Sequence, residues 1–320
     1  MTSKNNFHNI GLVGAGEFGS FASKVIKKLP RFRLYAVLDT NEKAAKDLAK
    51  AFNAKVVSHY AELLGDPKCD IIMINTPNYL HGKMTIQALN CGKKVLCEKP
   101  LFISRAEGRK VKKALVKSKG VALVNVLLPH SRIYQRIKKT IKNKTFGNLR
   151  HISIKNLATE STIKTRWYWD RKKSGGWFLT ADIHFYDLLL ELTGDVKLVG
   201  ATEHLKNGRS VAIYTNLACA GASASIFHSF DAGYDGVDFK ADFIFENAQI
   251  QVNGWVPVEM RIRRGNKVKV MKEETDRESL YQSLVGQNFL LLDKATHADS
   301  LAAINRAITA SEVAFKAEKC

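Results

Sequence analysis

A glycine-rich turn near the start of the chain has the residue types and spacing to hold a diphosphate. Gly14, Gly16 and Gly19 form a GxGxxG pattern between a strand-like run that ends at Val13 and a helical pattern that begins at Phe18. The first glycine permits a sharp turn, the second lets backbone N–H groups approach a pyrophosphate, and the third lets helix and strand pack closely. The positive end of the following helix favours an anion. The pattern therefore predicts a dinucleotide site.

An acidic residue follows at the distance at which such sites contact the adenosine ribose. Asp39 closes the second strand-like run, 20 residues after Gly19, and a carboxylate there accepts hydrogen bonds from ribose hydroxyls. Its negative charge repels the 2′-phosphate of NADP. The sequence therefore favours NAD over NADP, although Lys43 and Lys46 nearby keep NADP open.

Two further polar motifs follow strand-like runs in the same part of the chain. Segment 75–81 reads NTPNYLH after the fourth run, and segment 97–100 reads CEKP after the fifth. Open α/β sheets bind ligands at the carboxyl ends of their strands. Lys99 would there be partly desolvated and close to a cationic nicotinamide, and both effects disfavour its charged form. Lys99 is therefore the candidate for exchanging a proton with a substrate hydroxyl or carbonyl.

The second half of the chain contains an aromatic, basic segment followed by a helical pattern with a histidine. Segment 166–173 reads RWYWDRKK and segment 174–187 reads SGGWFLTADIHFYD. On a helix, Thr180 and His184 share a face, whereas Asp182 points elsewhere. Aromatic rings stack on the C–H faces of sugars and cyclitols, and arginine grips carboxylate or phosphate. Pocket residues are therefore expected in both segments.

The glycine turn, the TPN loop and the EKP motif together resemble the Gfo/Idh/MocA family of glucose–fructose oxidoreductases and inositol dehydrogenases. The resemblance spans nearly the whole chain and implies an NAD(P)-dependent oxidoreductase that acts on the CH–OH groups of a sugar, a cyclitol or a derivative. It implies Lys99 and His184 as catalytic residues. The implied cofactor-binding residues are Gly14, Gly16, Glu17, Phe18, Gly19, Asp39, Thr76, Pro77, Asn78, His81, Glu98 and Lys99. The expected substrate-binding residues are Trp167, Trp169, Arg171, Thr180 and His184.

The chain departs from the family pattern at several positions. Thr180 stands where the family has its first aspartate, and Asp182 stands where the family has a glycine. A threonine can form a hydrogen bond but cannot act as a carboxylate. After Asn125, where many relatives carry an arginine, this chain has Val126. Two alternatives therefore stay open, namely a glycosidase that oxidises its substrate transiently with bound NAD, and a non-catalytic dinucleotide-binding or regulatory protein.

Two patterns of secondary structure are expected to position these motifs. Residues 1–126 alternate short β-branched runs with amphipathic stretches, which predicts an α/β fold, a doubly wound parallel sheet of the Rossmann type. Residues 127–320 place strands at hairpin spacing, which predicts an α+β substrate-binding domain with a large, mostly antiparallel open sheet. We expect this sheet to mediate a homo-oligomer, a dimer or tetramer, and the closing helix to pack back on the first domain.

Composition and charge argue against several other classes of protein. Of the 320 residues, 45% are hydrophobic and 25% are charged, and no run approaches the roughly 18 apolar residues of a membrane span. The first residues show no secretory pattern, and the five cysteines form no CxxC pair, so we expect a cytoplasmic protein without a metal site. The net charge of +20 is spread over helix faces without a nucleic-acid-binding motif, so nucleic acid is not the expected partner.

Overall fold

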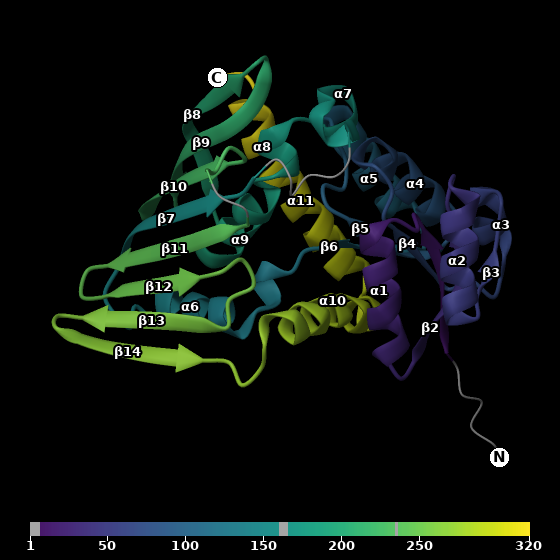
Figure 1. Ribbon diagram of the computed structural model, residues 1–320, viewed down its shortest axis with the longest axis horizontal. Coiled ribbons are helices and arrows are strands. Elements are labelled where there is room, and N and C mark those ends of the chain that lie inside the picture. The colour runs from purple at the N-terminus through teal and green to yellow at the C-terminus, as the bar shows by residue number, and fades with distance from the viewer. Residues whose placement is uncertain (1–6, 160–165, 234–235) are drawn as a thin grey trace. The chain divides into compact units, whose positions relative to one another are not determined.

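The computed structural model describes residues 7–159, 166–233 and 236–320, and it divides into two compact units (Figure 1). The first unit comprises Met1–Val126 and Gln282–Ile308. The second comprises Leu127–Tyr281 and Thr309–Cys320. Residues 282–308, which follow the second unit's strands in the chain, thus belong to the first unit.

The first unit is built on a six-stranded parallel sheet with the order β3-β2-β1-β4-β5-β6. All four residues of its central strand β4 are buried, as expected of a strand covered on both faces. The strands are β1 (His8–Val13), β2 (Phe32–Leu38), β3 (Lys55–Val56), β4 (Ile71–Ile74), β5 (Lys94–Glu98) and β6 (Val121–Asn125). This order is that of a dinucleotide-binding fold and confirms the predicted Rossmann architecture.

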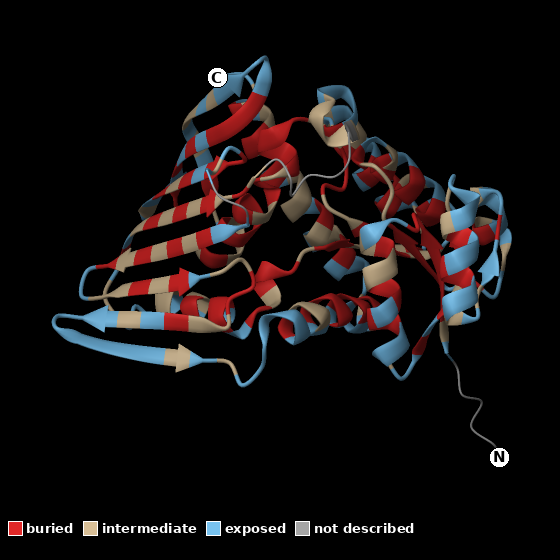
Figure 2. Ribbon diagram, viewed as in Figure 1, coloured by how far each residue is buried: buried red, intermediate tan, exposed pale blue. Residues whose placement is uncertain are grey.

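Amphipathic helices accompany this sheet, and their buried and exposed faces are visible in Figure 2. Several of them follow a polar residue whose side chain accepts a backbone N–H, for example Asn41 before α2 and Ser104 before α5. The helices are α1 (Glu17–Lys28), α2 (Glu42–Phe52), α3 (Tyr60–Gly65), α4 (Asn78–Asn90), α5 (Arg105–Lys117) and, divided between the units, α10 (Arg277–Lys294) and α11 (His297–Ala317). The short α3 was not predicted, because six residues show too little periodicity.

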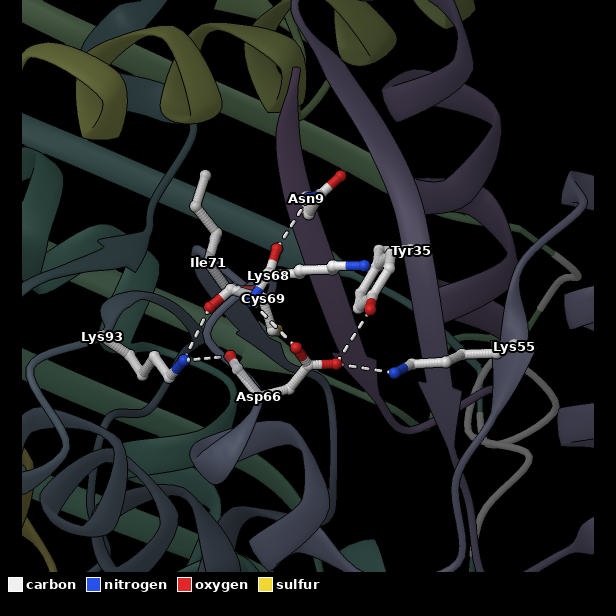
Figure 3. Close-up of polar contacts among 8 residues, drawn as sticks. All are labelled: Asn9, Tyr35, Lys55, Asp66, Lys68, Cys69, Ile71 and Lys93. Carbon is white, nitrogen blue, oxygen red and sulfur yellow. Dashed lines mark hydrogen bonds and ion pairs between the residues drawn. The ribbon is translucent and has the colours of Figure 1, made fainter. Parts of the chain in front are cut away.

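A polar network around Asp66 joins several segments of the first unit (Figure 3). Its carboxylate lies 2.6 Å from Lys55 Nζ and accepts a hydrogen bond of 2.9 Å from the Tyr35 hydroxyl. Lys93 Nζ donates to the backbone carbonyls of Asp66 and Cys69. The hydrogen bonds from Lys55 and from the backbone lower the pKa of Asp66 to about 2. The network connects strands β2 and β3 with the segments that directly precede β4 and β5.

Asp66→Asn is expected to lower the free energy of unfolding by about 1 to 2 kcal/mol at pH 7, since the partly solvated carboxylate loses its ion pair. The folded-state pKa of Asp66 lies below the ordinary value. Its contribution is therefore present above about pH 4 and lost as the pH falls towards 2. Urea denaturation at pH 7 and near pH 2 measures both effects. Asp47→Asn, which breaks an exposed pair with Lys43, should change stability by less than about 0.5 kcal/mol.

The second unit contains an eight-stranded sheet with the order β14-β13-β12-β11-β7-β10-β9-β8. Neighbouring strands are antiparallel except β7 and β10, which run parallel. The strands are β7 (Leu149–Leu157), β8 (Val196–Lys206), β9 (Arg209–Cys219), β10 (Ala222–Ser229), β11 (Asp238–Phe245), β12 (Gln249–Asn253), β13 (Glu259–Arg264) and β14 (Lys267–Lys272). The prediction of a large, mostly antiparallel sheet is confirmed.

Helices cover one face of this sheet. Tyr134 of α6 (Arg132–Lys142) contacts Phe243 of β11. Phe185 of α9 (Ile183–Thr193) contacts Phe239, which lies on the same face of β11 as Phe243. On the opposite face, β11 carries half-buried residues, and the alternation is visible along the strands in Figure 2. The remaining short helices are η1 (Leu128–His130), η3 (Arg166–Trp169), α7 (Arg171–Ser174) and α8 (Trp177–Thr180). Within the described residues, no helix has the length and apolarity that crossing a membrane requires.

Candidate active site

The glycine turn between β1 and α1 is tightly packed at its first and third glycines. Gly14 has φ +99°, and a Cβ added there would lie 2.6 Å from the carbonyl oxygen of Asn75. A Cβ on Gly19 would lie 2.0 Å from the carbonyl oxygen of Gly14. Glycine is therefore required at both positions, as the sequence predicted, because the turn folds back against α1 and the end of β4.

The space over the second glycine is open. A Cβ on Gly16, which directly precedes α1, would meet no atom within 4 Å. After β4, the side-chain amide of Asn75 is buried, and neither its nitrogen nor its oxygen has a hydrogen-bond partner among the described residues. Buried amides are normally satisfied. The turn therefore combines room for a ligand, a helix N-terminus and a buried polar side chain.

Asp39 binds the glycine turn itself. Its carboxylate accepts hydrogen bonds from the backbone N–H of Ala15 at 2.6 Å and of Asn41 at 2.7 Å. A carboxylate has about four acceptor sites, so these two bonds leave capacity for ribose hydroxyls. Asp39 therefore has a structural role that the sequence did not predict, in addition to its expected role in cofactor choice.

His81 connects the two loops that follow β4 and β5. Its ring is buried, with Nε2 2.7 Å from the carbonyl oxygen of Thr76 and Nδ1 2.7 Å from that of Pro100. Burial lowers the pKa of His81. Because both ring nitrogens contact backbone carbonyls, the histidine fixes the spacing of the TPN and EKP loops, and direct contact with a cofactor stays a prediction.

Glu98 ends β5, Lys99 directly follows it, and each of these neighbours influences the charge of the other. Burial lowers the pKa of Lys99 to about 8, opposed by the negative charge of Glu98. Burial raises the pKa of Glu98 to about 7, opposed by a hydrogen bond from Asn125 and by the charge of Lys99. A lysine with this pKa is partly neutral near pH 7 to 8, so it can accept and release a proton there.

In the second unit, His184 lies in the first turn of α9 beside an aromatic residue that the sequence did not single out. Its ring is 4.8 Å from the ring of Trp255 in an edge-to-face arrangement. Trp255 also contacts Tyr281, at 6.2 Å. Trp255 follows β12, and its position beside His184 depends on the tertiary fold. A tryptophan in a Gly-Trp-Val-Pro turn was the only sequence signal available.

The expected substrate contacts have partners inside the second unit. The buried hydroxyl of Thr180 donates to the carbonyl oxygen of Ser174 at 2.8 Å, so a carboxylate in its place would face that oxygen. The guanidinium of Arg171 contacts Glu203 and Glu318. The rings of Trp167 and Trp169 are half-buried and contact Tyr168 and Trp177 respectively. Contact of these four residues with a substrate stays a prediction.

Asp182, which stands where the family pattern has a glycine, forms a buried pair with His228. Its Oδ1 lies 2.8 Å from His228 Nδ1, and Nε2 of the same ring lies 2.7 Å from Asn156 Nδ2. Burial raises the pKa of Asp182, opposed by the hydrogen bond from His228. These three side chains connect the start of α9, where His184 lies, to strands β7 and β10. In the described part of the chain, no group of His, Cys, Asp and Glu is placed to hold a metal ion.

Comparison with protein-family models gives two matches. A model described as an oxidoreductase family with an NAD-binding Rossmann fold matches residues 8–126, and a model of the GFO/IDH/MocA C-terminal domain matches residues 134–251. The chain belongs to the Gfo/Idh/MocA family. The resemblance predicted from the glycine turn, the TPN loop and the EKP motif is thus confirmed.

Two curated relatives of this chain are distant from it in sequence. An uncharacterized oxidoreductase, YrbE, of Bacillus subtilis is 27% identical over 190 residues, which are 58% of this chain and 53% of that protein. Myo-inositol 2-dehydrogenase of Thermotoga maritima is 24% identical over 58% of this chain and 55% of its own. The chain thus spans about half the length of the curated relatives it matches. A solved levoglucosan dehydrogenase in complex with NADH and levoglucosan superposes with a TM-score of 0.80 at 18% identity, covering 97% of both chains, which shows a common fold.

The residues of this Gfo/Idh/MocA chain fit the dinucleotide that its NAD-binding Rossmann domain implies. Gly16 leaves the space that a pyrophosphate needs at the start of α1, and Asp39 retains acceptors for a ribose. Asn75, which the sequence placed in a motif but not among the contacts, offers a buried amide that no described residue pairs with, at the same edge of the sheet. Its position directly before the TPN sequence was the signal that could have identified it.

Proposed function

We propose that this chain is an NAD-dependent oxidoreductase that moves a hydride between nicotinamide and an oxygen-bearing carbon of a sugar, cyclitol or derivative. The observation that carries the proposal is the position of Lys99 directly after β5, where burial lowers its pKa to about 8 and so suits it for proton transfer. Lys99 directly follows β5, at the same edge of the parallel sheet as the glycine turn. That edge is where folds of this type bind their ligands.

In this mechanism, side chains of the protein transfer the proton. Bound NAD supplies the hydride acceptor. Neutral Lys99 accepts the hydroxyl proton as the carbon is oxidised, and protonated Lys99 returns it to the carbonyl in reduction. His184 is the second proposed catalytic residue, and the Asp182–His228 pair supports this role by fixing the start of α9. Thr180 carries a hydroxyl where the family has a carboxylate, so it can form a neutral hydrogen bond but cannot act as a base.

A carbohydrate or cyclitol fits the aromatic character of the second unit. Trp167, Trp169 and Trp255 are half-buried, and such rings stack on the C–H faces of sugar rings. The dehydrogenases among the relatives act on inositol and levoglucosan according to their names, which supports this substrate class. We also propose that the chain forms a homo-oligomer through the sheet face opposite α6 and α9.

A panel of sugars and cyclitols, incubated with NAD and followed by NADH absorbance, tests the proposed activity. Substrate-dependent NADH formation supports it. Release of a free sugar from a glycoside without net NADH would instead identify an NAD-using glycosidase. Binding of NAD without either reaction on a broad panel would favour a non-catalytic dinucleotide-binding protein, an alternative that the departure at Thr180 keeps open.

NAD is expected to raise the melting temperature more than NADP at equal concentration, because a ligand of the folded state stabilises it by mass action and Asp39 repels a 2′-phosphate. Asp39→Asn removes the charge at nearly constant size and should narrow the difference between the cofactors. The melting temperature without cofactor is measured in parallel, since Asp39 also binds the turn. Equal or stronger stabilisation of the parent by NADP would contradict the assignment.

A further inference from the structure

Three side chains from separate parts of the first unit form a hydrogen-bonded chain that ends at Glu98. Asn288 of α10 donates from Nδ2 to Oδ1 of Asn125 at 2.8 Å, and Asn125 donates from Nδ2 to Oε1 of Glu98. Asn125 and Asn288 are each 2% exposed. Asn125 ends β6 and is the register partner of Glu98 at the end of β5. The chain thus connects a helix from the end of the sequence to the residue directly before Lys99.

The backbone fixes the direction of this chain. Asn288 Nδ2 also donates to the carbonyl oxygen of Val126 at 3.0 Å, and a carbonyl can only accept. The amide nitrogen of Asn288 must therefore point towards Val126 and Asn125. A reversed Asn125 would place two NH₂ groups against each other, so Asn125 must present its oxygen to Asn288 and its nitrogen to Glu98. Glu98 consequently faces a donor, which favours its ionised form.

We propose that Asn288 is a positioning residue for Lys99: acting through Asn125, it holds a hydrogen-bond donor against the Glu98 carboxylate and so keeps a negative charge beside the lysine. The importance of this arrangement for catalysis rests on the proposed function, in which Lys99 transfers the proton. The arrangement itself is a property of the first unit and can be measured without a substrate.

The mutual influence of Glu98 and Lys99 indicates that Asn288 would affect the pKa values of both groups. Burial raises the pKa of Glu98 to about 7, and the bond from Asn125 opposes this rise. The charge of Glu98 raises the pKa of Lys99, which burial lowers to about 8. The other titratable groups that face the pair are His81 of α4, whose pKa is lowered by burial and by Lys99, and the buried thiol of Cys97. Neither belongs to the chain from Asn288.

Asn288→Leu is expected to shift the titration of Lys99 to lower pH by about half a unit to one unit. Without Asn288, Asn125 is no longer held in one orientation, and Glu98 loses its fixed donor. The pKa of Glu98 then rises, the neutral acid predominates near pH 7, and Lys99 loses the negative charge that supports its protonated form. The loss of the donor therefore raises the pKa of Glu98, and the resulting loss of negative charge lowers the pKa of Lys99.

Competitive acylation with acetic anhydride measures this shift in the whole protein without cofactor or substrate. The extent of modification of Lys99 is determined by peptide mass spectrometry from pH 6 to about 10, relative to exposed Lys112 of α5. The parent should show a midpoint near 8 and Asn288→Leu a lower one, with Lys112 unchanged. Gln287→Leu, which removes an exposed amide from the adjacent position of α10, is the matched control and should match the parent.

A double-mutant cycle separates positioning from general disturbance of the fold. Glu98→Gln should lower the Lys99 midpoint at least as far as Asn288→Leu, and adding Asn288→Leu to Glu98→Gln should produce no further shift. Should Asn288→Leu fail to fold, Asn125→Leu removes the donor directly and should give the same shift. An unchanged or higher Lys99 midpoint in a folded variant, or full additivity in the cycle, overturns the proposal. Absence of turnover on every substrate would contradict the proposed function and leave this measurement unaffected.

Discussion

Lys99→Ala is expected to lower turnover by about 10²-fold or more, because it removes the group that accepts the substrate proton. The affinity for NAD should change by no more than a few-fold, since the glycine turn and Asp39 are intact. Turnover of the parent in the oxidative direction should rise through about pH 8, where Lys99 loses its proton. Steady-state kinetics over a pH series, with NAD affinity measured by calorimetry, tests each statement.

Lys99→Arg serves as the control for charge. Arginine preserves a cation at this position but is not deprotonated in proteins, so it should be nearly as inactive as alanine. Turnover of either variant within a few-fold of the parent would show that another group transfers the proton. A turnover that falls across pH 8 in the oxidative direction would contradict the role of neutral Lys99.

Gly19→Ala is expected to abolish measurable NAD binding and to lower the free energy of unfolding by about 2 kcal/mol or more. Its Cβ would lie 2.0 Å from the carbonyl oxygen of Gly14, which is backbone and cannot turn aside. The glycine turn and the start of α1 must therefore separate. Denaturant unfolding measures the loss of stability, and the shift of the melting temperature with NAD measures binding.

Gly16→Ala is the matched control, because its Cβ enters open space in the protein alone. This variant should keep the stability of the parent without cofactor yet bind NAD about tenfold or more weakly, since the methyl group occupies the space expected for the pyrophosphate. Tight NAD binding by Gly16→Ala would place the pyrophosphate elsewhere. Stability of Gly19→Ala equal to the parent would show that the turn can rearrange at little cost.

Most of the fold of the first unit was predictable because its signals are local. Short β-branched runs alternate with amphipathic helices, and buried parallel strands such as β4 are apolar throughout. The helix α3 shows the limit of this approach, since its six residues are too few to establish a period. In the second unit, alternation along β11 predicted a sheet with one covered face, but the parallel pairing of β7 with β10 leaves no local signal.

The candidate site was predictable where glycine geometry or a motif marked it, and not where a partner is distant in sequence. Gly14 and Gly19 are required by contacts within a few residues or with the adjacent strand. The link between Asn288 and Asn125 joins positions separated by 163 residues. His228 showed no metal-ligand spacing, yet it pairs with Asp182 in the core.

The sequence by itself determined which chemistry is available: a turn that admits a diphosphate, an acid after the second strand, and a lysine at the end of the fifth. These features depend on residue type and short spacing, which the linear chain contains. Only the tertiary structure decided which partners the side chains of these segments contact. Asn288 and Asn125 connect to the carboxylate beside Lys99, two carboxylates contact Arg171, and a carbonyl accepts a hydrogen bond from Thr180. The motif predicted the direction of the Lys99 pKa shift, but side-chain pairing arises from neighbours that meet when the chain packs, and no local pattern specifies those neighbours.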